Sequence, residues 1–347
     1  MEKRRLGQTD LDVSILCLGT MMFGDQITES DARAQMDACV DRGVTFFDTA
    51  ELYTIPPRPE TQGESERIVG RWIAERGNRK DIILATKVAG RAQMDWLRNG
   101  AECRLTKSQI IAAVERSLKN LQTDYIDLYQ THWPDRPVQL FGATLKGYVH
   151  YDDPGAPIEE TLEAIDALVR SGKVRHVGVS NETPYGIMRH LEASRTRNLP
   201  RIVSIQNAYN LLNRTFEFGL AEIALEEQVG LLAYSPIAQG SLTGKYLDNA
   251  KPAGSRRAFM DRMQRYQKPN AEKAIRHYVS LAKTFDLHPA AFAMAFVTSR
   301  PFLTSNIFGA NGLDQLDIIF NSAEITWTDE MEKAVNEAYA DLQNPCP

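Results

Sequence analysis

"VTFFDTAELYT" (residues 44–54) begins as a buried β-strand and then changes character. Phe46 and Phe47 give its first half the composition that strands favour. Asp48 follows directly, and Tyr53 comes five residues later. Two polar groups at the end of an apolar run are either ordinary loop residues or part of a site at the end of the strand. The second interpretation is favoured if other strands of the chain end in the same way.

Short β-rich apolar runs alternate with longer segments of helical period along the whole chain. The eight strand candidates are "ILCLGT" (15–20), "VTFFD" (44–48), "IILATK" (82–87), "YIDLYQTH" (125–132), "HVGVSN" (176–181), "IVSIQN" (202–207), "LLAYSP" (231–236) and "LTSNIFGA" (303–310). Eight strands, each followed by a helical segment, predict an α/β protein with a closed (β/α)₈ TIM barrel. A doubly wound open sheet is the alternative. We expect residues 1–347 to form a single domain.

Three helix boundaries can be predicted from particular residues. Thr106 and Gln109 match a capping box at the start of a helix. Thr183 followed by Pro184 predicts an N-cap with proline at the first helical position. Gly172 follows a helical pattern and is typical of a left-handed C-terminal stop.

Three segments outside this rhythm are expected at the two ends of the barrel. Residues 1–14 alternate around the turn-like "GQTD" and predict a small N-terminal β-hairpin that plugs the barrel bottom. Two long segments, 55–63 and 134–157, follow the carboxyl ends of predicted strands. Long loops at that rim usually shape access for the substrate.

Composition and charge argue against several classes of function. A net charge of −5, with basic and acidic residues interspersed, gives no cationic stripe for nucleic acid or anionic lipid. The four cysteines lack CxxC spacing, and the six histidines lack metal-ligand spacing. No signal-like run and no apolar stretch of about 18 residues is found. We therefore expect a cytoplasmic protein that acts on a small molecule, with no metal, membrane or nucleic-acid partner.

Polar residues close several of the predicted strands. Asp48 closes the second, Lys87 the third and His132 the fourth, while Tyr53 lies on the loop after the second. Each alone has an ordinary interpretation, as a loop cap, a solvated strand end, a packed histidine or a loop aromatic. In a barrel, however, the carboxyl ends of all strands meet at one mouth, so these four side chains are expected to lie together.

Together the four groups suit the reduction of a carbonyl or the oxidation of an alcohol. A free tyrosine, with a pKa of about 10, is a weak acid at neutral pH. A nearby ammonium lowers the pKa of a phenol, so Lys87, held by Asp48, would make Tyr53 a better proton donor. A neutral His132 would orient the substrate carbonyl oxygen. Such a site requires a source of hydride.

Candidate residues for a nicotinamide cofactor occur without the common dinucleotide motif, since no GxGxxG follows any predicted strand. Ser180, Asn181 and Gln206 place hydroxyl and amide groups at the next strand ends, which suits a carboxamide. Tyr234 offers a flat ring on which a nicotinamide could stack. Loop and turn chemistry is the other interpretation of the serine and asparagine.

Seven segments resemble, in order and spacing, the aldo-keto reductase family. They are "FFDTAELY", "ATKV", "DLYQTHWPD", "GVSN", "IQNAYNLLNR", "AYSPIAQGSLTGKY" and "FGANGLDQL". The resemblance covers about residues 3–340, and the "YTIPPRPETQG" loop is similar to that of Tas-type bacterial NADP(H)-dependent members.

The resemblance implies a function and a set of binding residues. Tyr53 would be the proton donor, Lys87 and Asp48 its tuning pair and His132 the substrate-orienting residue, with hydride passing from NADPH to an aldehyde or ketone. The segment 235–245 would wrap the pyrophosphate, and 309–315 would lie along the adenosine. The implied cofactor-binding residues are Gly19, Thr20, Asp48, Ser180, Asn181, Gln206, Tyr234, Ser235, Pro236, Leu242, Gly244, Lys245, Gly309, Ala310, Asn311 and Gln315.

One stretch departs from the family's pattern. Many members carry an acidic residue and an asparagine that reach the adenine, whereas this chain has Asp317, Ile318 and Ile319. No arginine stands between Ala310 and Gln315 to meet a 2′-phosphate, which leaves NADH open beside NADPH. Candidates from the preceding loop are Arg256, Arg257, Arg262 and Arg265, although a solvated basic helix face explains them equally well.

Two other functions are compatible with the same residues. A nucleotide-binding regulatory subunit, as in the potassium-channel β subunits of the same family, would keep all four site residues. A Schiff-base aldolase would use Lys87 as its nucleophile. The sequence contains no pattern that names the carbonyl substrate or the oligomeric state.

Overall fold

A closed barrel of eight parallel strands forms the centre of the computed structural model, which describes residues 1–141, 147–259 and 264–347. The strands are β3 (Leu16–Gly19), β4 (Phe46–Asp48), β5 (Ile83–Val88), β6 (Ile126–Thr131), β7 (Val174–Ser180), β8 (Ile202–Ala208), β9 (Gly230–Tyr234) and β10 (Leu303–Phe308). They pair in chain order, and β10 pairs back onto β3. Each strand overlaps its predicted run, so the (β/α)₈ barrel is confirmed and the open sheet is wrong.

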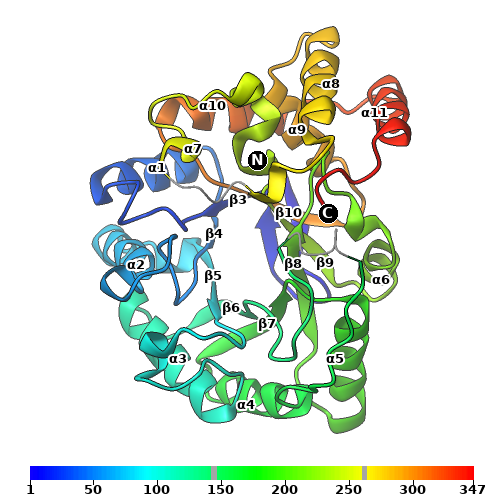
Figure 1. The fold of residues 1–347 in the computed structure, drawn as a ribbon. Helices are drawn as coiled ribbons and strands as arrows, with labels where there is room; N and C mark the ends of the chain where they lie inside the picture. Colours follow the sequence, from blue (N-terminus) through cyan, green and yellow to red (C-terminus); the bar gives the residue numbers. More distant parts are fainter. Residues whose placement is uncertain (142–146, 260–263) are drawn as a thin grey trace.

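Helices surround the barrel as an outer ring (Figure 1). They are α1 (Glu29–Asp41), α2 (Glu64–Arg76), α3 (Lys107–Leu121), α4 (Ile158–Arg170), α5 (Pro184–Arg197), α6 (Leu220–Glu226), α7 (Arg256–Phe259), α8 (Ala271–Thr284), α9 (Pro289–Thr298), α10 (Leu313–Ser322) and α11 (Asp329–Asp341). Apolar side chains at helical spacing face the strands; α3, for example, buries Ile110, Val114 and Leu118 on one side. In a barrel of this kind the helices cover the sides, and the site lies at the end where the strands have their carboxyl termini.

Two of the three predicted helix boundaries are confirmed, and the third is wrong in its detail. The Thr183 hydroxyl accepts from the Gly186 N–H at 3.2 Å, and Gly172 has a φ of +77° just after α4. Thr106 does precede α3, but its side chain caps no N–H. Gln109 turns away from the predicted capping box because its Oε1 accepts from the Arg104 N–H at 2.8 Å.

The N-terminal hairpin closes the bottom of the barrel, as predicted. Strands β1 (Lys3–Arg5) and β2 (Asp12–Ser14) pair antiparallel. Leu6 and Val13, both fully buried, pack in one apolar cluster with inward-facing residues of the barrel. Those residues are Cys17, Phe46, Ala85, Leu128, Val203, Leu232 and Ile307. Side chains therefore fill the bottom of the barrel, and the opposite end is the candidate for a ligand site.

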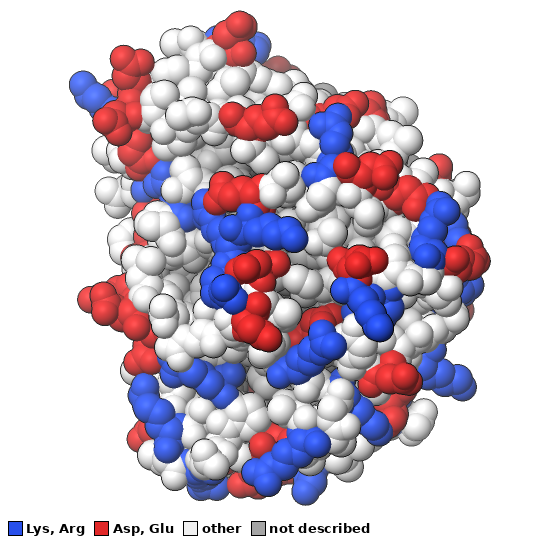
Figure 2. All heavy atoms as spheres, turned by 180° about the vertical axis from the view of Figure 1, so that it is seen from behind, with Lys and Arg blue, Asp and Glu red and all other residues white. Residues whose placement is uncertain are grey.

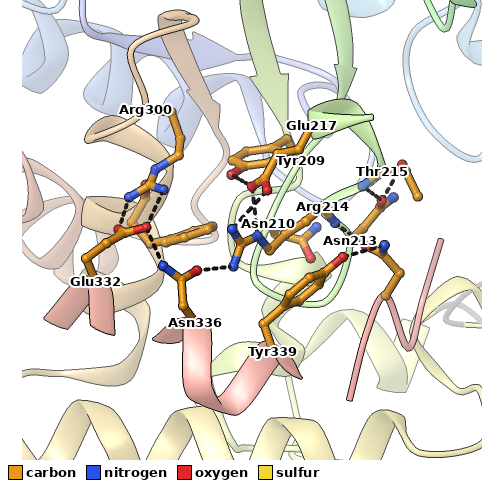
Figure 3. Close-up of polar contacts among 12 residues, drawn as sticks. Tyr209, Asn210, Asn213, Arg214, Thr215, Glu217, Arg300, Glu332, Asn336 and Tyr339 are labelled. Atoms are coloured by element: carbon orange, nitrogen blue, oxygen red, sulfur yellow. Dashed lines mark hydrogen bonds and ion pairs between the residues drawn. The ribbon is translucent and has the colours of Figure 1, made fainter. Parts of the chain in front are cut away.

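A polar cluster fastens the last helix, α11, to the barrel wall (Figure 3). Arg214, in the loop after β8, donates to Asn336 of α11 at 2.9 Å and pairs with Glu217 at 2.7 Å. Asn336 in turn donates to Glu332, which pairs with Arg300 at the turn before β10. The cluster joins segments far apart in the chain, so it stabilises the barrel's closure on the β8–β10 side.

Charges of both signs alternate on the face of the molecule seen from behind in Figure 2. Lysine and arginine side chains there lie next to aspartate and glutamate side chains instead of forming a patch of one sign. This face therefore offers no extended cationic surface of the kind that binds a phosphate backbone. Among the described helices, none has the length and apolar character needed to cross a membrane.

Candidate active site

The polar residues at the strand ends occupy the inward face of the barrel because of the two-residue period of a strand. Phe46 packs in the barrel's interior, and Asp48, two residues later, lies on the same face at the carboxyl end. Ala85 and Lys87 repeat the arrangement on the neighbouring strand β5. The apolar lower layer thus gives way to a polar upper layer at the barrel mouth.

Lys87 and Asp48 form a buried ion pair at this mouth. The Lys87 Nζ lies 2.5 Å from the Asp48 Oδ2 and donates to the Thr49 carbonyl at 2.8 Å. The lysine side chain is 0% exposed and that of the aspartate 3%. The other oxygen of Asp48 accepts from the amides of Gln130 at 3.1 Å and Gln206 at 2.9 Å. Both carboxylate oxygens are therefore satisfied, which fixes the ammonium in place.

Tyr53 lies beside this pair on the loop that follows β4. Its ring centroid is 5.1 Å from the Lys87 Nζ, and the residue is only 8% exposed. The backbone of Tyr53 is held at both ends, since its N–H donates to Ala50 and its carbonyl accepts from Gly63. On the other side the His132 ring meets the Tyr53 ring edge-on, with centroids 5.5 Å apart. The structure thus brings together all four residues that the strand ends indicated.

The environment of Lys87 and Tyr53 favours a charged amine and a protonated phenol. Burial is the strongest single influence on Lys87 and acts to lower its pKa, but the charge and hydrogen bond of Asp48, together with the charges of Tyr53 and Cys17, outweigh it, so the pKa is raised. Burial also raises the pKa of Tyr53, and Lys87 opposes this without reversing it. The expected net lowering of the Tyr53 pKa is therefore wrong for the protein alone, because removal from water costs the phenolate more than one neighbouring ammonium returns.

His132 is neutral and keeps a ring nitrogen for other partners. Burial, aided by the charge of Lys87, holds its pKa well below the usual range for histidine. Its Nδ1 is buried and has no hydrogen-bond partner among the described residues. Its backbone N–H donates to Val88 at 2.8 Å, which anchors the residue just past the end of β6. A neutral imidazole in this position can bond to an oxygen at the mouth.

A second buried ion pair holds the loop that carries Tyr53. The Glu51 carboxylate accepts hydrogen bonds from the two terminal nitrogens of Arg98, at 2.5 and 2.8 Å, and from the Ala89 N–H at 2.8 Å. Glu51 is 1% exposed and Arg98 8%. The Glu51 N–H donates to the Lys87 carbonyl at 3.2 Å. Glu51 therefore ties the loop after β4 to the loop after β5, the two segments that bring Tyr53 and Lys87 together.

The predicted carboxamide-binding residues lie at the ends of the next strands and bond to one another. The Ser180 hydroxyl donates to the Gln206 carbonyl at 2.7 Å. The Asn181 amide donates to the His132 carbonyl at 2.8 Å, and its oxygen accepts from the Tyr234 hydroxyl at 2.7 Å. The Gln206 side-chain oxygen accepts no hydrogen bond from the described residues, although its amide is used. A ligand that carries an amide would therefore find the Tyr234 ring held in place by Asn181 and the Gln206 side-chain oxygen available as an acceptor.

The segment after β9 curls tightly where the pyrophosphate was predicted. Five residues have left-handed backbones, Ser235 (φ +57°), Ala238 (+50°), Gln239 (+57°), Gly240 (+90°) and Gly244 (+81°). Pro236 lies between them, and Leu242 is buried beneath the curl. The N–H groups of Ala238, Gly240 and Gly244 already donate to carbonyls within the curl, so Lys245, which pairs with no described carboxylate, is the group that it offers to a diphosphate.

The remaining predicted cofactor residues border the same mouth on the β3 and β10 side. Gly19 pairs with Asp48 across the strands, and a Cβ there would come within 2.9 Å of Ile307. Thr20 is buried and donates to the Asp48 carbonyl at 3.2 Å. Past β10, a Cβ on Gly309 would meet only one atom within 4 Å, at 3.8 Å. This part of the rim is therefore open to a ligand.

The predicted adenosine side is ordered by local hydrogen bonds. Asn311 directly follows Ala310, and its backbone N–H donates to the Gln315 side chain of α10 at 3.1 Å. The Asn311 amide donates to the Gly254 carbonyl at 3.2 Å. The segment around Gly254 thus reaches the end of β10. Asp317, by contrast, is exposed and pairs with Arg42 at 3.4 Å, while Ile319 is buried in the core.

The four loop arginines proposed from the sequence have different surroundings. Arg257 donates to the Tyr246 and Ala250 carbonyls, both at 3.3 Å, so it supports its own loop. Arg256 directly follows the Gly254–Ser255 turn. Arg265 lies against the Tyr234 ring, 5.6 Å from its centroid. Arg262 lies outside the described residues.

Sequence reasoning missed several residues of the site. Gln130 lies between Leu128 and His132 at the two-residue period that places all three on the inward face, so that period could have revealed it. Glu51 stands between Asp48 and Tyr53, but a single carboxylate in a loop carries no sign of its partner. Arg98 gave no signal, because its pairing depends on the path of the loop after β5.

Comparisons with known proteins identify the chain as an oxidoreductase built on this barrel. The family model described as "Aldo/keto reductase family" matches residues 15–340. The chain is 44% identical to "Protein tas" of Escherichia coli (strain K12) over 348 residues, 100% of both chains. It is 32% identical to "Aldo-keto reductase YhdN" of Bacillus subtilis (strain 168), covering 97% and 93%, and 29% identical to "Norsolorinic acid reductase B" of Aspergillus parasiticus, covering 94% and 81%. The chain belongs to the aldo-keto reductase family, as its motifs predicted.

Proposed function

We propose that this protein reduces aldehydes or ketones to alcohols with NADPH, and that Tyr53 is the proton donor. One observation carries the proposal. The Lys87 Nζ, 2.5 Å from Asp48, lies 5.1 Å from the Tyr53 ring, and His132 flanks the same ring at 5.5 Å. A phenol, an ammonium and a neutral imidazole around one point supply an acid, a charge and an orienting group.

Each residue has a distinct part in the proposed reaction. Bound NADPH supplies the hydride that reaches the carbonyl carbon. His132 bonds to the carbonyl oxygen and orients it beside the Tyr53 hydroxyl. Tyr53 gives its proton to that oxygen as negative charge develops on it. In the reverse direction the Tyr53 phenolate takes the proton from the alcohol.

Lys87 and Asp48 act on Tyr53 and not on the substrate itself. Once Tyr53 has lost its proton, the Lys87 ammonium faces a phenolate and stabilises it. Asp48 keeps the amine protonated and fixed, which is why the raised pKa of Lys87 supports this role. The same raised pKa opposes a Schiff-base aldolase, because a protonated amine cannot attack a carbonyl.

Three parts of the barrel mouth support binding of a nicotinamide dinucleotide. The Gln206 oxygen and the Ser180–Asn181 pair would hold the carboxamide, with the Tyr234 ring stacked on the nicotinamide. The left-handed curl after β9, ending at Lys245, would hold the pyrophosphate.

Preference for NADPH over NADH is proposed to come from Arg256. The Asn311 to Gly254 hydrogen bond brings this arginine's segment to the adenosine side, whereas Arg265 lies at the opposite, nicotinamide side. An arginine can bind a 2′-phosphate with two parallel hydrogen bonds. We expect Arg256→Gln to weaken NADPH binding by about tenfold or more and to leave NADH binding unchanged. Equal weakening of both would assign Arg256 to the fold of the loop.

The activity can be tested with purified protein, NADPH and an aromatic aldehyde. We expect continuous loss of absorbance from NADPH and one alcohol formed for each NADPH consumed. A protein that binds NADPH but turns over no more than once would contradict the enzyme proposal and favour the regulatory alternative.

A further inference from the structure

Arg265 has no acidic partner among the described residues, unlike several arginines around the barrel mouth. Arg104 pairs with Asp135 at 2.7 Å, and Arg136 pairs with Glu182. Arg265, by contrast, forms no ion pair with any described carboxylate, and its polar contacts are two tyrosine hydroxyls, that of Tyr234 at 3.4 Å and that of Tyr266. The residue is half-buried, so its charge is partly removed from water, and no carboxylate in the described part of the chain balances it.

A continuous line of side chains connects Arg265 with the proposed proton donor. From His132, which meets the Tyr53 ring, the contacts pass to Trp133 at 4.8 Å between centroids. The Trp133 ring then meets Phe141 at 6.5 Å, and the Arg265 guanidinium lies 5.1 Å from the Phe141 centroid. Phe141 is 52% exposed and belongs to the long loop after β6, so the 134–157 loop and the loop before α8 meet here.

Tyr234 closes the line into a circuit around the mouth. Its hydroxyl accepts from Arg265 and donates to Asn181, whose amide donates to the His132 carbonyl. The proposed proton donor therefore lies at one end of a line of contacting side chains, aromatic rings lie along it, and the Arg265 guanidinium lies at the other end.

We propose that Arg265 is a specificity residue that binds an anionic group on the substrate, so that the favoured substrates are aromatic or apolar carbonyl compounds carrying a carboxylate. This inference rests on the proposed reduction at Tyr53. The guanidinium is always charged and presents a planar fork that matches a carboxylate. Lys245 already provides a cation for the cofactor phosphates, while the Arg265 guanidinium lies over the Phe141 and Tyr234 rings, so we assign the anion facing Arg265 to the substrate.

A purely structural role for Arg265 predicts a different effect of its loss on the two kinds of substrate. The rings of Phe141 and Tyr234 could hold the guanidinium only to fasten two loops together. Loss of that contact would affect neutral and anionic substrates alike, whereas loss of an anion site affects only the anionic ones.

The experiment compares para-carboxybenzaldehyde with its neutral methyl ester as substrates of the whole protein with NADPH. We expect wild type to prefer the carboxylate, and Arg265→Gln to lower kcat/KM for it by about tenfold or more while the ester changes by less than about twofold. Arg91→Gln is the matched control, since it removes the same charge from an arginine at the same rim that already pairs with Asp153 and Glu102. We expect this control to leave the ratio of the two substrates unchanged.

Three results would overturn the assignment. An unchanged kcat/KM for both substrates in Arg265→Gln excludes a carboxylate contact. Equal losses for both substrates indicate a structural role, and equal losses with a weaker Kd for NADPH assign the anion to the cofactor. If wild type reduces neither aldehyde, the proposed function fails, and binding of para-methylbenzoate against its amide in wild type and Arg265→Gln then tests the anion site by itself; equal binding of the two ligands would contradict it.

Discussion

Two buried aspartates at opposite ends of the barrel show how one electrostatic arrangement can serve two purposes. Asp48 ends β4 at the open mouth and pairs with Lys87, which is 0% exposed. Asp127 lies at the start of β6, near the closed bottom, and pairs with Arg79 and Arg175, both at 2.8 Å. Each carboxylate also accepts from another donor, Gln130 or the Leu84 N–H. Burial and hydrogen bonding alone therefore do not separate a catalytic site from a structural one.

The difference lies in the cation and in what stands next to it. The guanidiniums of Arg79 and Arg175 both lie over the Tyr125 ring, each 3.9 Å from its centroid. Arginine remains charged at all relevant pH values, so that pair holds strands together and transfers nothing. Lys87 instead approaches Tyr53, the proposed proton donor. A pair of this kind becomes a candidate for catalysis when a titratable group and an open mouth adjoin it.

The largest effect is expected from Lys87→Met, which breaks the mouth pair. Loss of the ammonium should lower kcat by about 10²–10⁴-fold, the usual size of general acid catalysis. The residual rate should persist to higher pH, because the pKa of Tyr53 rises further without Lys87. A pH–rate profile measured beside wild type checks both points. A profile of unchanged shape would remove Lys87 from the tuning of Tyr53.

A smaller loss of activity is expected from Glu51→Gln, which weakens the support of the Tyr53 loop. Small displacements of a catalytic group can lower the rate by up to about a hundredfold. We expect a lower kcat with an unchanged Kd for NADPH, since the loop and not the cofactor site is affected. If kcat stays within twofold of wild type, the Glu51–Arg98 pair does not position Tyr53.

Asp127→Asn should separate stability from activity. Removing one partner of a buried ion pair costs about 3–5 kcal/mol, and the low end is expected because the Arg175 side chain is 49% exposed. Urea unfolding should show this loss, while kcat of the folded protein stays within about twofold of wild type. A large drop in kcat without loss of stability would mean that the bottom pair also supports the reaction, and the comparison would fail.

The smallest effect concerns Glu66, a buried carboxylate of α2 that belongs to neither pair and accepts from Thr86 at 2.7 Å and Asn120 at 3.0 Å. Burial raises its pKa, so the folded protein keeps a proton that the unfolded chain releases, and this contribution to stability is lost as pH rises from about 4.5 through the raised pKa. Glu66→Gln cannot lose a proton. We expect the free energy of unfolding of the variant, measured in urea, to rise relative to that of wild type by about 1 kcal/mol or less between pH 4.5 and pH 7. A difference that is constant with pH would contradict this.

The sequence predicted the barrel and the members of its mouth because both depend on local patterns. Strand composition placed Asp48, Lys87 and His132 at carboxyl ends, and parallel strands in a barrel bring such ends together. Arg98 and Arg265 could not be assigned in this way, since loop paths decide what they touch. The direction of the Tyr53 pKa was also missed, because burial depends on the packing of the whole mouth.

The central claim is that the Tyr53 hydroxyl supplies the proton, and single-turnover stopped-flow of Tyr53→Phe with NADPH and para-carboxybenzaldehyde tests it most directly. The substitution removes one oxygen from a side chain that is 8% exposed and leaves the pair beneath it intact. We expect the Kd for NADPH to match wild type and the rate of NADPH oxidation to fall by about a hundredfold or more. A rate within tenfold of wild type would contradict the account.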